Sequence, residues 1–206
     1  MALAAPAFVD LSPTLDGRLV RIEPLAARHE EGLRNAAADP RTWRWMPLNP
    51  TADAGAFHDW MTDALARAAA GLDAPFCIPR AGGGEPLGST RYLALRPEHR
   101  SLEIGWTWLS PAAWGTGANA EGKLLLLEHA FERLGCMRVE FKTDALNERS
   151  RAALLAIGAQ FEGIHRRHML VRDGELRDSA WYSVIDDEWP ATKAALAERV
   201  AAKEAR

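Results

Sequence analysis

Apolar and polar residues follow two different periods along this chain. Apolar positions recur every three to four residues over 55–70, and a stretch rich in Ala, Glu, Arg and Leu covers 26–38, which favours two helices. Ahead of them, Leu19–Glu23 alternates apolar and charged residues, as a half-buried strand does. The first third of the chain therefore predicts one strand followed by two helices, with an aromatic loop over 41–47 between the helices.

From residue 75 onward the pattern becomes mainly strand-like. Glycine- and proline-rich turns at 81–86 and 172–174 separate alternating runs and indicate hairpins. The predicted elements are strands 76–78, 87–95 and 102–109, helix 120–134, strand 137–143, helix 147–157, strands 160–171 and 177–185, and helix 190–203. Because neither a repeat nor a linker interrupts this order, we expect one domain over residues 1–206, with a core of about 15–190 and a C-terminal helix at 190–203.

Composition narrows the class of protein. Of the 206 residues 48% are hydrophobic, which is enough for one well-filled core, and a net charge of −3 does not suit a protein that follows a nucleic-acid backbone. Cys77 and Cys136 stand alone, without the Cys/His spacing of a zinc site, so we expect neither a disulfide framework nor a metal. The first six residues lack the features of a signal peptide, and apolar runs are too short to span a bilayer, which predicts a cytoplasmic protein without membrane partners.

The segment Trp114-Gly115-Thr116-Gly117-Ala118-Asn119 joins a predicted strand to the clearest predicted helix. A glycine-rich turn at a helix N-terminus presents free backbone N–H groups, which bind phosphate. One candidate ligand is a dinucleotide, but Ala120 stands where the fingerprint needs its third glycine, and the segment arrives halfway along the chain. The other candidate is an acyl-coenzyme A.

Several motifs together resemble the GNAT superfamily of N-acetyltransferases, in the branch of the ribosomal-protein alanine acetyltransferases. The resemblance runs from Leu15 to Pro190. It is carried by Glu103-Ile104-Gly105-Trp106, Trp114 to Glu121, His129-Ala130-Phe131, Asn147-x-x-Ser150 and Gly158-Ala159-x-x-Glu162-Gly163. It implies an α/β (α+β) fold with a mixed, mostly antiparallel central sheet, flanked by helices and splayed where acyl-coenzyme A binds.

The resemblance also implies a reaction and a donor site. In this family the amine attacks the thioester of acetyl-coenzyme A directly, without an acyl-enzyme. The implied donor residues are the backbone near Trp108 and Leu109, the loop residues Trp114, Gly115, Thr116, Gly117, Ala118 and Asn119, and Asn147. Asn119 departs from the family's Gly or Ala, and two roles stay open for it: a helix N-cap or a hydrogen-bond donor to phosphate. A non-catalytic coenzyme A-binding module of the same fold is the alternative function.

Candidate proton-transfer groups lie on both sides of the loop. Glu103, on the preceding strand, stands where some relatives carry a general base, and alternation places it on one face with Gly105 and Thr107, opposite Ile104, Trp106 and Trp108. His168 or water are the other candidate bases. By resemblance Ser150 protonates the leaving thiolate, although a hydroxyl is a weak acid.

The acceptor is expected to be a small-molecule amine or a peptide N-terminus. Eight tryptophans favour an aromatic-lined cleft. The candidate acceptor residues are Trp43, Trp45, Arg91, Trp106 and His168, and Arg91 is of the type that binds carboxylate or phosphate. A homodimer is common in this branch, and the sequence leaves that state open.

Overall fold

A computed structural model describes residues 8–204 except 54 and 173. Residues 1–7, which the absence of a signal peptide concerns, and position 173 of the predicted 172–174 turn lie outside the described residues. The order of strands across the sheet is β1-β2-β3-β4-β5-β6-β8-β7. The strands are β1 (Leu15–Asp16), β2 (Arg21–Pro24), β3 (Ala74–Pro79), β4 (Pro86–Arg96), β5 (Ser101–Leu109), β6 (Arg138–Asp144), β7 (Gln160–Val171) and β8 (Glu175–Ile185).

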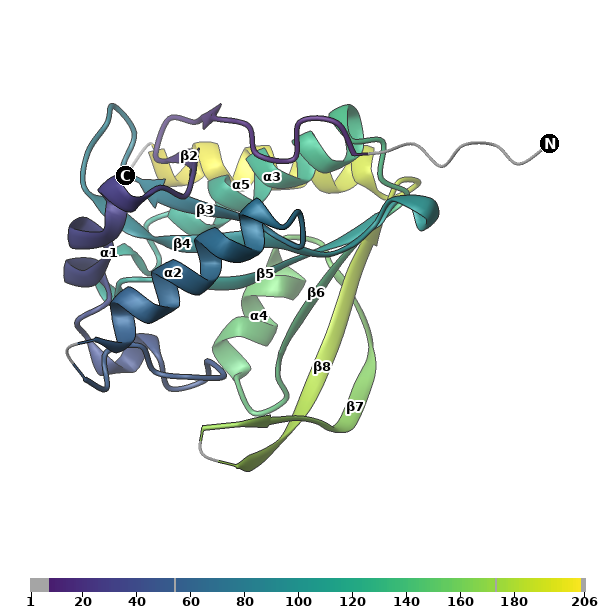
Figure 1. The fold of residues 1–206 in the computed structure, drawn as a ribbon. Coiled ribbons are helices and arrows are strands. Elements are labelled where there is room, and N and C mark those ends of the chain that lie inside the picture. Colours follow the sequence, from purple (N-terminus) through teal and green to yellow (C-terminus); the bar gives the residue numbers. More distant parts are fainter. Residues whose placement is uncertain (1–7, 54, 173, 205–206) are drawn as a thin grey trace.

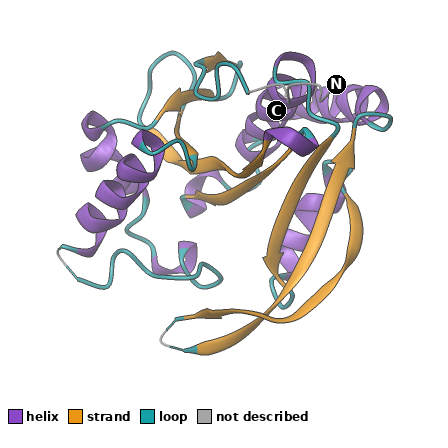
Figure 2. Cartoon of the chain, turned by 45° about the vertical axis from the view of Figure 1, so that its right-hand side comes forward, coloured by secondary structure: helices purple, strands orange, loops and turns teal. Residues whose placement is uncertain are grey.

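Helices cover both faces of this sheet (Figures 1 and 2). They are α1 (Glu30–Ala36), α2 (Ala56–Ala69), α3 (Ala118–Glu128), α4 (Glu148–Ala156) and α5 (Trp189–Glu204). One core packs between the sheet and α3, α4 and α5, and includes Leu126, Leu154 and Leu196. A second core lies under α1 and α2 and includes Leu33 and Trp60. The three-layer arrangement follows from sheet faces that each need an apolar helix surface to cover them.

The sheet is antiparallel throughout except between β5 and β6. These two strands are parallel because α3 carries the chain back across the sheet between them. Their pairing is short, since it joins only Ser101–Glu103 to Arg138–Glu140. Beyond that point the strands diverge, and the sheet opens into two halves (Figure 1). The predicted fold class, a mixed and mostly antiparallel sheet splayed at one place, is confirmed, whereas the core limits 15–190 stay a prediction.

Most predicted elements form close to their expected limits, and three local differences have physical reasons. The first helix begins as a 3₁₀ turn at Ala27–His29, so that regular α-helix covers only Glu30–Ala36. The predicted 120–134 helix ends in a π-helical turn at His129–Arg133, where a wider turn completes the element. The two-residue strand β1 was not predicted because it is too short to show a period.

The carboxylate of Glu121 fixes the start of the chain to α3. It accepts hydrogen bonds from the backbone N–H groups of Arg18, Leu19 and Val20 at 2.9, 2.7 and 2.7 Å. A side chain at Gly17 would lie 2.5 Å from Glu121 Oε2, so glycine is needed there. Because the glutamate is only 4% exposed, water does not replace these bonds when they are lost.

We predict that Glu121→Gln lowers the free energy of unfolding by about 2 kcal/mol, since an amide accepts fewer and weaker hydrogen bonds than a carboxylate. Urea denaturation measures the change. Glu128→Gln, at an exposed position of the same helix, is the matched control and should cost at most about 0.5 kcal/mol. Equal losses in the two variants would contradict this role.

Candidate active site

The gap between β5 and β6 forms one end of a cavity of about 370 Å³. Its walls come from residues 103–109 of β5, 141–143 of β6, the loop before α3, and the first turns of α3 and α4. The loop over 45–47 and the β7–β8 hairpin contribute to one end, and α5 contributes to the other. A hollow that joins the diverging strands to a helix N-terminus has room for a long ligand with a charged end.

A β-bulge in β5 shapes the wall of this cavity. Ser89 of β4 pairs with Trp108 and Arg91 pairs with Gly105, so that one residue of β4 faces two residues of β5. Trp106 takes up the extra length with a φ of +51°, in the left-handed region that residues other than glycine seldom adopt. The bulge breaks regular pairing with β4 beside the gap, where β5 also has no partner in β6.

The bulge changes which side chains share a face. Ile104 packs in the core below α3, as the predicted alternation requires. Trp106 and Trp108 instead pack with the α1 and α2 core, and the Thr107 hydroxyl faces α3, where it accepts a hydrogen bond from Lys123 Nζ. The expected grouping of Thr107 with Glu103, and of both tryptophans with Ile104, is therefore wrong beyond Gly105, because the extra residue reverses the alternation.

The glycine-rich loop has the geometry expected of a phosphate site. Gly115 has a φ of +76° with open space around it, and Gly117, with a φ of +100°, is the N-cap residue of α3. A side chain at Gly117 would lie 2.9 Å from Lys203 Cβ. Asn119 lines the cavity as the second residue of the helix, so the N-cap role considered for it is wrong. Trp114 also lines the cavity, whereas the Thr116 hydroxyl donates to the carbonyl of Ala113 at 2.7 Å.

Three cations at this end were missed by the sequence interpretation. Arg149 of α4 and Arg199 and Lys203 of α5 all line the cavity. Arg149 lies with its guanidinium carbon 3.4 Å from the centre of the Trp114 ring, a cation–π contact. Helix α5 packs against α3 and brings residues from the far end of the chain to Gly117. The spacing of single basic residues on an amphipathic helix carries no signal for such a meeting.

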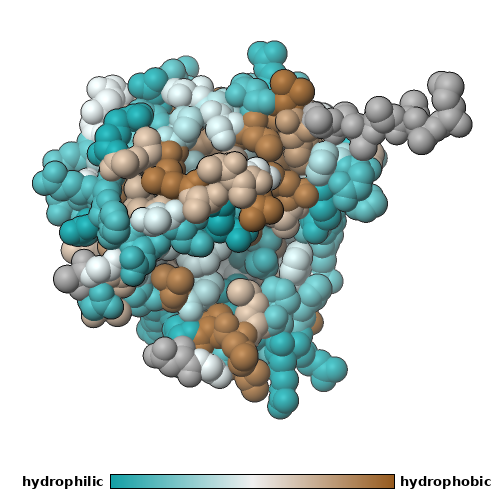
Figure 3. All heavy atoms as spheres, in the orientation of Figure 1, coloured by the Kyte–Doolittle hydropathy of each residue, from teal (hydrophilic) through white to brown (hydrophobic). Residues whose placement is uncertain are grey.

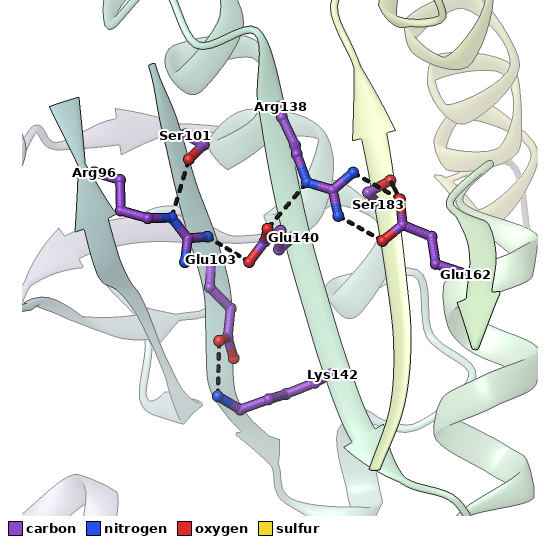
Figure 4. Close-up of polar contacts among 8 residues, drawn as sticks. All are labelled: Arg96, Ser101, Glu103, Arg138, Glu140, Lys142, Glu162 and Ser183. Atoms are coloured by element: carbon purple, nitrogen blue, oxygen red, sulfur yellow. Dashed lines mark hydrogen bonds and ion pairs between the residues drawn. The ribbon is translucent and has the colours of Figure 1, made fainter. Parts of the chain in front are cut away.

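Glu103 lies at the point where β5 and β6 separate. It is 2% exposed, and its Oε2 accepts a hydrogen bond from Lys142 Nζ of β6 at 2.9 Å (Figure 4). Burial raises the pKa of the Glu103 carboxyl, and the attraction of Lys142 works in the opposite direction. A side chain at Gly105 would lie 2.5 Å from Glu103 Oε1, so the glycine leaves the space that the carboxylate occupies. The pair is a buried acid–base group open to the cavity.

Lys123 is a second buried ionisable group in the cavity wall that the sequence interpretation missed. It is 5% exposed, donates to Thr107 Oγ1 at 2.6 Å, and lies 5.7 Å from the centre of the Phe141 ring. Burial lowers the pKa of this lysine to about 7. A signal was present in the sequence, because a lysine four residues before Leu127 shares the apolar face of the helix.

The predicted α4 residues come to the same cavity. Asn147 is the N-cap of α4, and its Oδ1 accepts a hydrogen bond from the backbone N–H of Ser150 at 3.1 Å. Both residues line the cavity, together with the backbone of Trp108 and Leu109 across the gap. The capping role of Asn147 is thus present, and it places the start of α4 against the cavity.

The predicted acceptor residues separate into two groups. Trp45 and Trp106 line the cavity. Trp43, 2% exposed, does not, because it packs 5.0 Å from the Trp108 ring and donates its Nε1–H to the carbonyl of Ala37. Arg91, also 2% exposed, lies under Trp106 and donates to Asp73 at 3.3 Å, away from the cavity surface. His168 lies outside the lining, 3.0 Å from Ser179 Oγ, and burial lowers its pKa.

Comparisons with known proteins assign the family. Residues 20–160 match the model of the acetyltransferase (GNAT) domain. A GCN5-related N-acetyltransferase from Brucella melitensis is 30% identical, with a TM-score of 0.85 over 96% of this chain and 87% of that one. A protein from T. thermophilus whose structure carries the name of an acetyltransferase is 40% identical, with a TM-score of 0.82 over 90% and 96%. The chain therefore belongs to the GNAT family and is an acetyltransferase of that family.

Two further likenesses are partial. YoaA of Bacillus subtilis (strain 168), named an uncharacterized N-acetyltransferase, is 32% identical over 108 residues, 52% of this chain and 60% of YoaA. Mycobacterium smegmatis RimJ, whose structure is a complex with CoA-disulfide, shares the fold at 22% identity, with a TM-score of 0.76 over 91% of this chain and 93% of that one. This fold is consistent with the ribosomal-protein acetyltransferase branch. Among the described residues, helices long and apolar enough to cross a membrane are absent.

The buried position of Lys123 predicts a dependence of stability on pH. The unfolded lysine has a pKa near 10.4, against about 7 in the folded protein, so the unfolded state binds more protons between these values. The free energy of unfolding should therefore rise with pH from 7 to 9, by up to about 1.4 kcal/mol per pH unit relative to Lys123→Met.

Denaturation at several pH values measures this difference, and Lys193→Met, at the surface of α5, should not remove it. If the wild-type and Lys123→Met curves run parallel over this range, the lysine does not titrate as the structure implies.

Proposed function

We propose that this acetyltransferase transfers an acetyl group from acetyl-coenzyme A to a primary amine by direct attack. The observation that carries the proposal is the continuous cavity from the Glu103 carboxylate, through the gap between β5 and β6, to the N-terminus of α3. The GNAT family and the fold shared with coenzyme A-bound RimJ support the same donor.

The residues present fit this donor. The open space at Gly115, the first N–H groups of α3, and the cations Arg199 and Lys203 form a binding place for phosphates. The unpaired edge of β5 near Trp108 and Leu109 offers backbone groups to an extended arm lying in the gap. Bound there, acetyl-coenzyme A supplies an acyl thioester as the group to be transferred.

The proton transfers are assigned to groups on the two sides of the gap. Glu103 accepts a proton from the incoming amine, and its raised pKa brings it closer to the working pH of a general base. A freed N–H near Trp108 or Leu109 stabilises negative charge on the carbonyl oxygen. Ser150 and Lys123 both line the cavity and are the candidate proton donors to the leaving thiolate, and the pKa of about 7 favours the lysine.

The donor assignment predicts that acetyl-coenzyme A raises the melting temperature, because a ligand that binds only the native state stabilises it. Arg199→Gln and Lys203→Gln should each weaken this binding roughly two- to fivefold through the loss of one phosphate partner. Calorimetric titration measures the dissociation constants. Lys193→Gln removes the same charge from α5 at its far end and is the control. A wild-type protein that ignores acetyl-coenzyme A would end the proposal.

The base assignment predicts that Glu103→Gln lowers kcat/KM by about 100-fold or more and removes the acidic limb of the pH profile. Coenzyme A thiol release with an amine acceptor measures the rate. Glu140→Gln is the matched control, because Glu140 lies beside Glu103 on the sheet but pairs with Arg96 and Arg138 outside the cavity (Figure 4).

Two results would count against catalysis by this residue set. An unchanged rate in Glu103→Gln would reject the base. Tight binding of acetyl-coenzyme A without thiol release to any amine would instead favour the alternative of a coenzyme A-binding module.

A further inference from the structure

Arg177 is a buried cation at the acceptor end of the cavity that neither the predicted site nor the proposed reaction uses. It lies on β8, opposite Met169 of β7, and both residues line the cavity. Only 6% of Arg177 is exposed. Its side chain therefore belongs to the wall of the hollow and not to the outer surface of the hairpin.

The guanidinium of Arg177 has no partner within the described part of the chain. Its Nε is buried without a hydrogen-bond acceptor, and neither an ion pair nor a side-chain hydrogen bond involves it there. The other arginines of this region differ, since Arg91 is paired with Asp73, and Arg172 with Asp144 and Glu175. Burial lowers the pKa of Arg177, and Asp144 opposes this shift from a distance.

The ionised groups near Arg177 leave an excess of positive charge. The two neighbouring carboxylates are already engaged, Glu103 by Lys142 and Asp144 by Arg172. With Arg177 these groups comprise three cations and two anions, all close to the cavity. A buried charge is costly unless a counter-charge meets it, so the arrangement favours an anion from the ligand. A planar guanidinium is best matched by a carboxylate, which it binds through two parallel hydrogen bonds.

The surroundings of Arg177 limit the size of that ligand. Arg172, near the hairpin tip, donates its backbone N–H to the carbonyl of Pro47 at 3.0 Å and its guanidinium to the carbonyl of Met46 at 3.1 Å. These bonds join the hairpin to the loop over 45–47 across the acceptor end. Leu170 and Leu176 remain exposed at the hairpin tip, where apolar residues gather on the surface (Figure 3). Trp45, Met46 and Met169 line the enclosed end, which suits a small molecule with an apolar part.

We propose that Arg177 binds a carboxylate of the acceptor, so that the preferred acceptor is a small amine carrying a carboxylate, as an amino acid does. This inference rests on the proposed N-acetyltransferase function and defines the class of its acceptor. The Arg177 guanidinium fixes the carboxylate at the hairpin wall, while the amine is directed toward Glu103. The anion-binding role considered for Arg91 thus passes to an arginine that the sequence did not single out.

The test compares L-amino acids with their carboxamides and with the amines that lack the carboxyl group. Wild-type kcat/KM should be at least about 30-fold higher for the acids, as expected for a buried charge pair. In Arg177→Gln the acids should fall to the level of the amides, mainly through KM, and Arg177→Lys should recover part of the preference. Arg166→Gln, an exposed position of β7, is the control and should keep it.

Binding provides a second readout that does not need turnover. With coenzyme A present, the amino acid should raise the melting temperature of the wild type but not of Arg177→Gln. Amides or aminoalkyl phosphonates that match or exceed the acids, or an acid preference that survives in Arg177→Gln, would overturn the inference. Failure of every amine, with no shift from acetyl-coenzyme A, would instead reject the proposed function. If Arg177→Gln does not fold, the wild-type series and Arg177→Lys decide the question.

Discussion

The end of pairing between β5 and β6 is the constraint on which the rest of this structure depends. Only three residues of each strand form the parallel ladder, and the next residues, Ile104 and Phe141, already belong to separating strands. Backbone groups on the inner edges are left without a strand partner, which is costly unless something else binds them. A cavity therefore follows from the topology, and its wall is made of main chain that a ligand can use.

Separated strands need other contacts to hold their spacing. The Lys142 ammonium reaches from β6 to the Glu103 carboxylate on β5, so one ion pair spans the gap near its origin. Below the gap, Lys123 of α3 donates to Thr107 of β5 and lies against the Phe141 ring of β6. The same side chains that maintain the opening are thus those with altered proton affinity, because the opening buries them without surrounding them with water.

Local pattern predicted what depends on local pattern. The order of elements, the limits of α2 and β7, and the glycine turn before α3 all follow from periods and turn residues close together in the sequence. The bulge at Trp106 did not follow, because it arises from pairing with β4. Trp43 and Arg91 resembled cleft residues until packing placed them below Trp108 and Trp106. Lys203 approaches Gly117 only through the docking of two helices far apart in the chain.

The contacts of Arg172 give the acceptor end an unusual kind of boundary. Main-chain carbonyls at Met46 and Pro47, and not bulky side chains, tie the hairpin to the opposite loop. Such a clasp can release and re-form without repacking a core. The range of molecules admitted is then set by the strength of a few hydrogen bonds, so substrate breadth can evolve through substitutions at one position while the chemistry below stays unchanged.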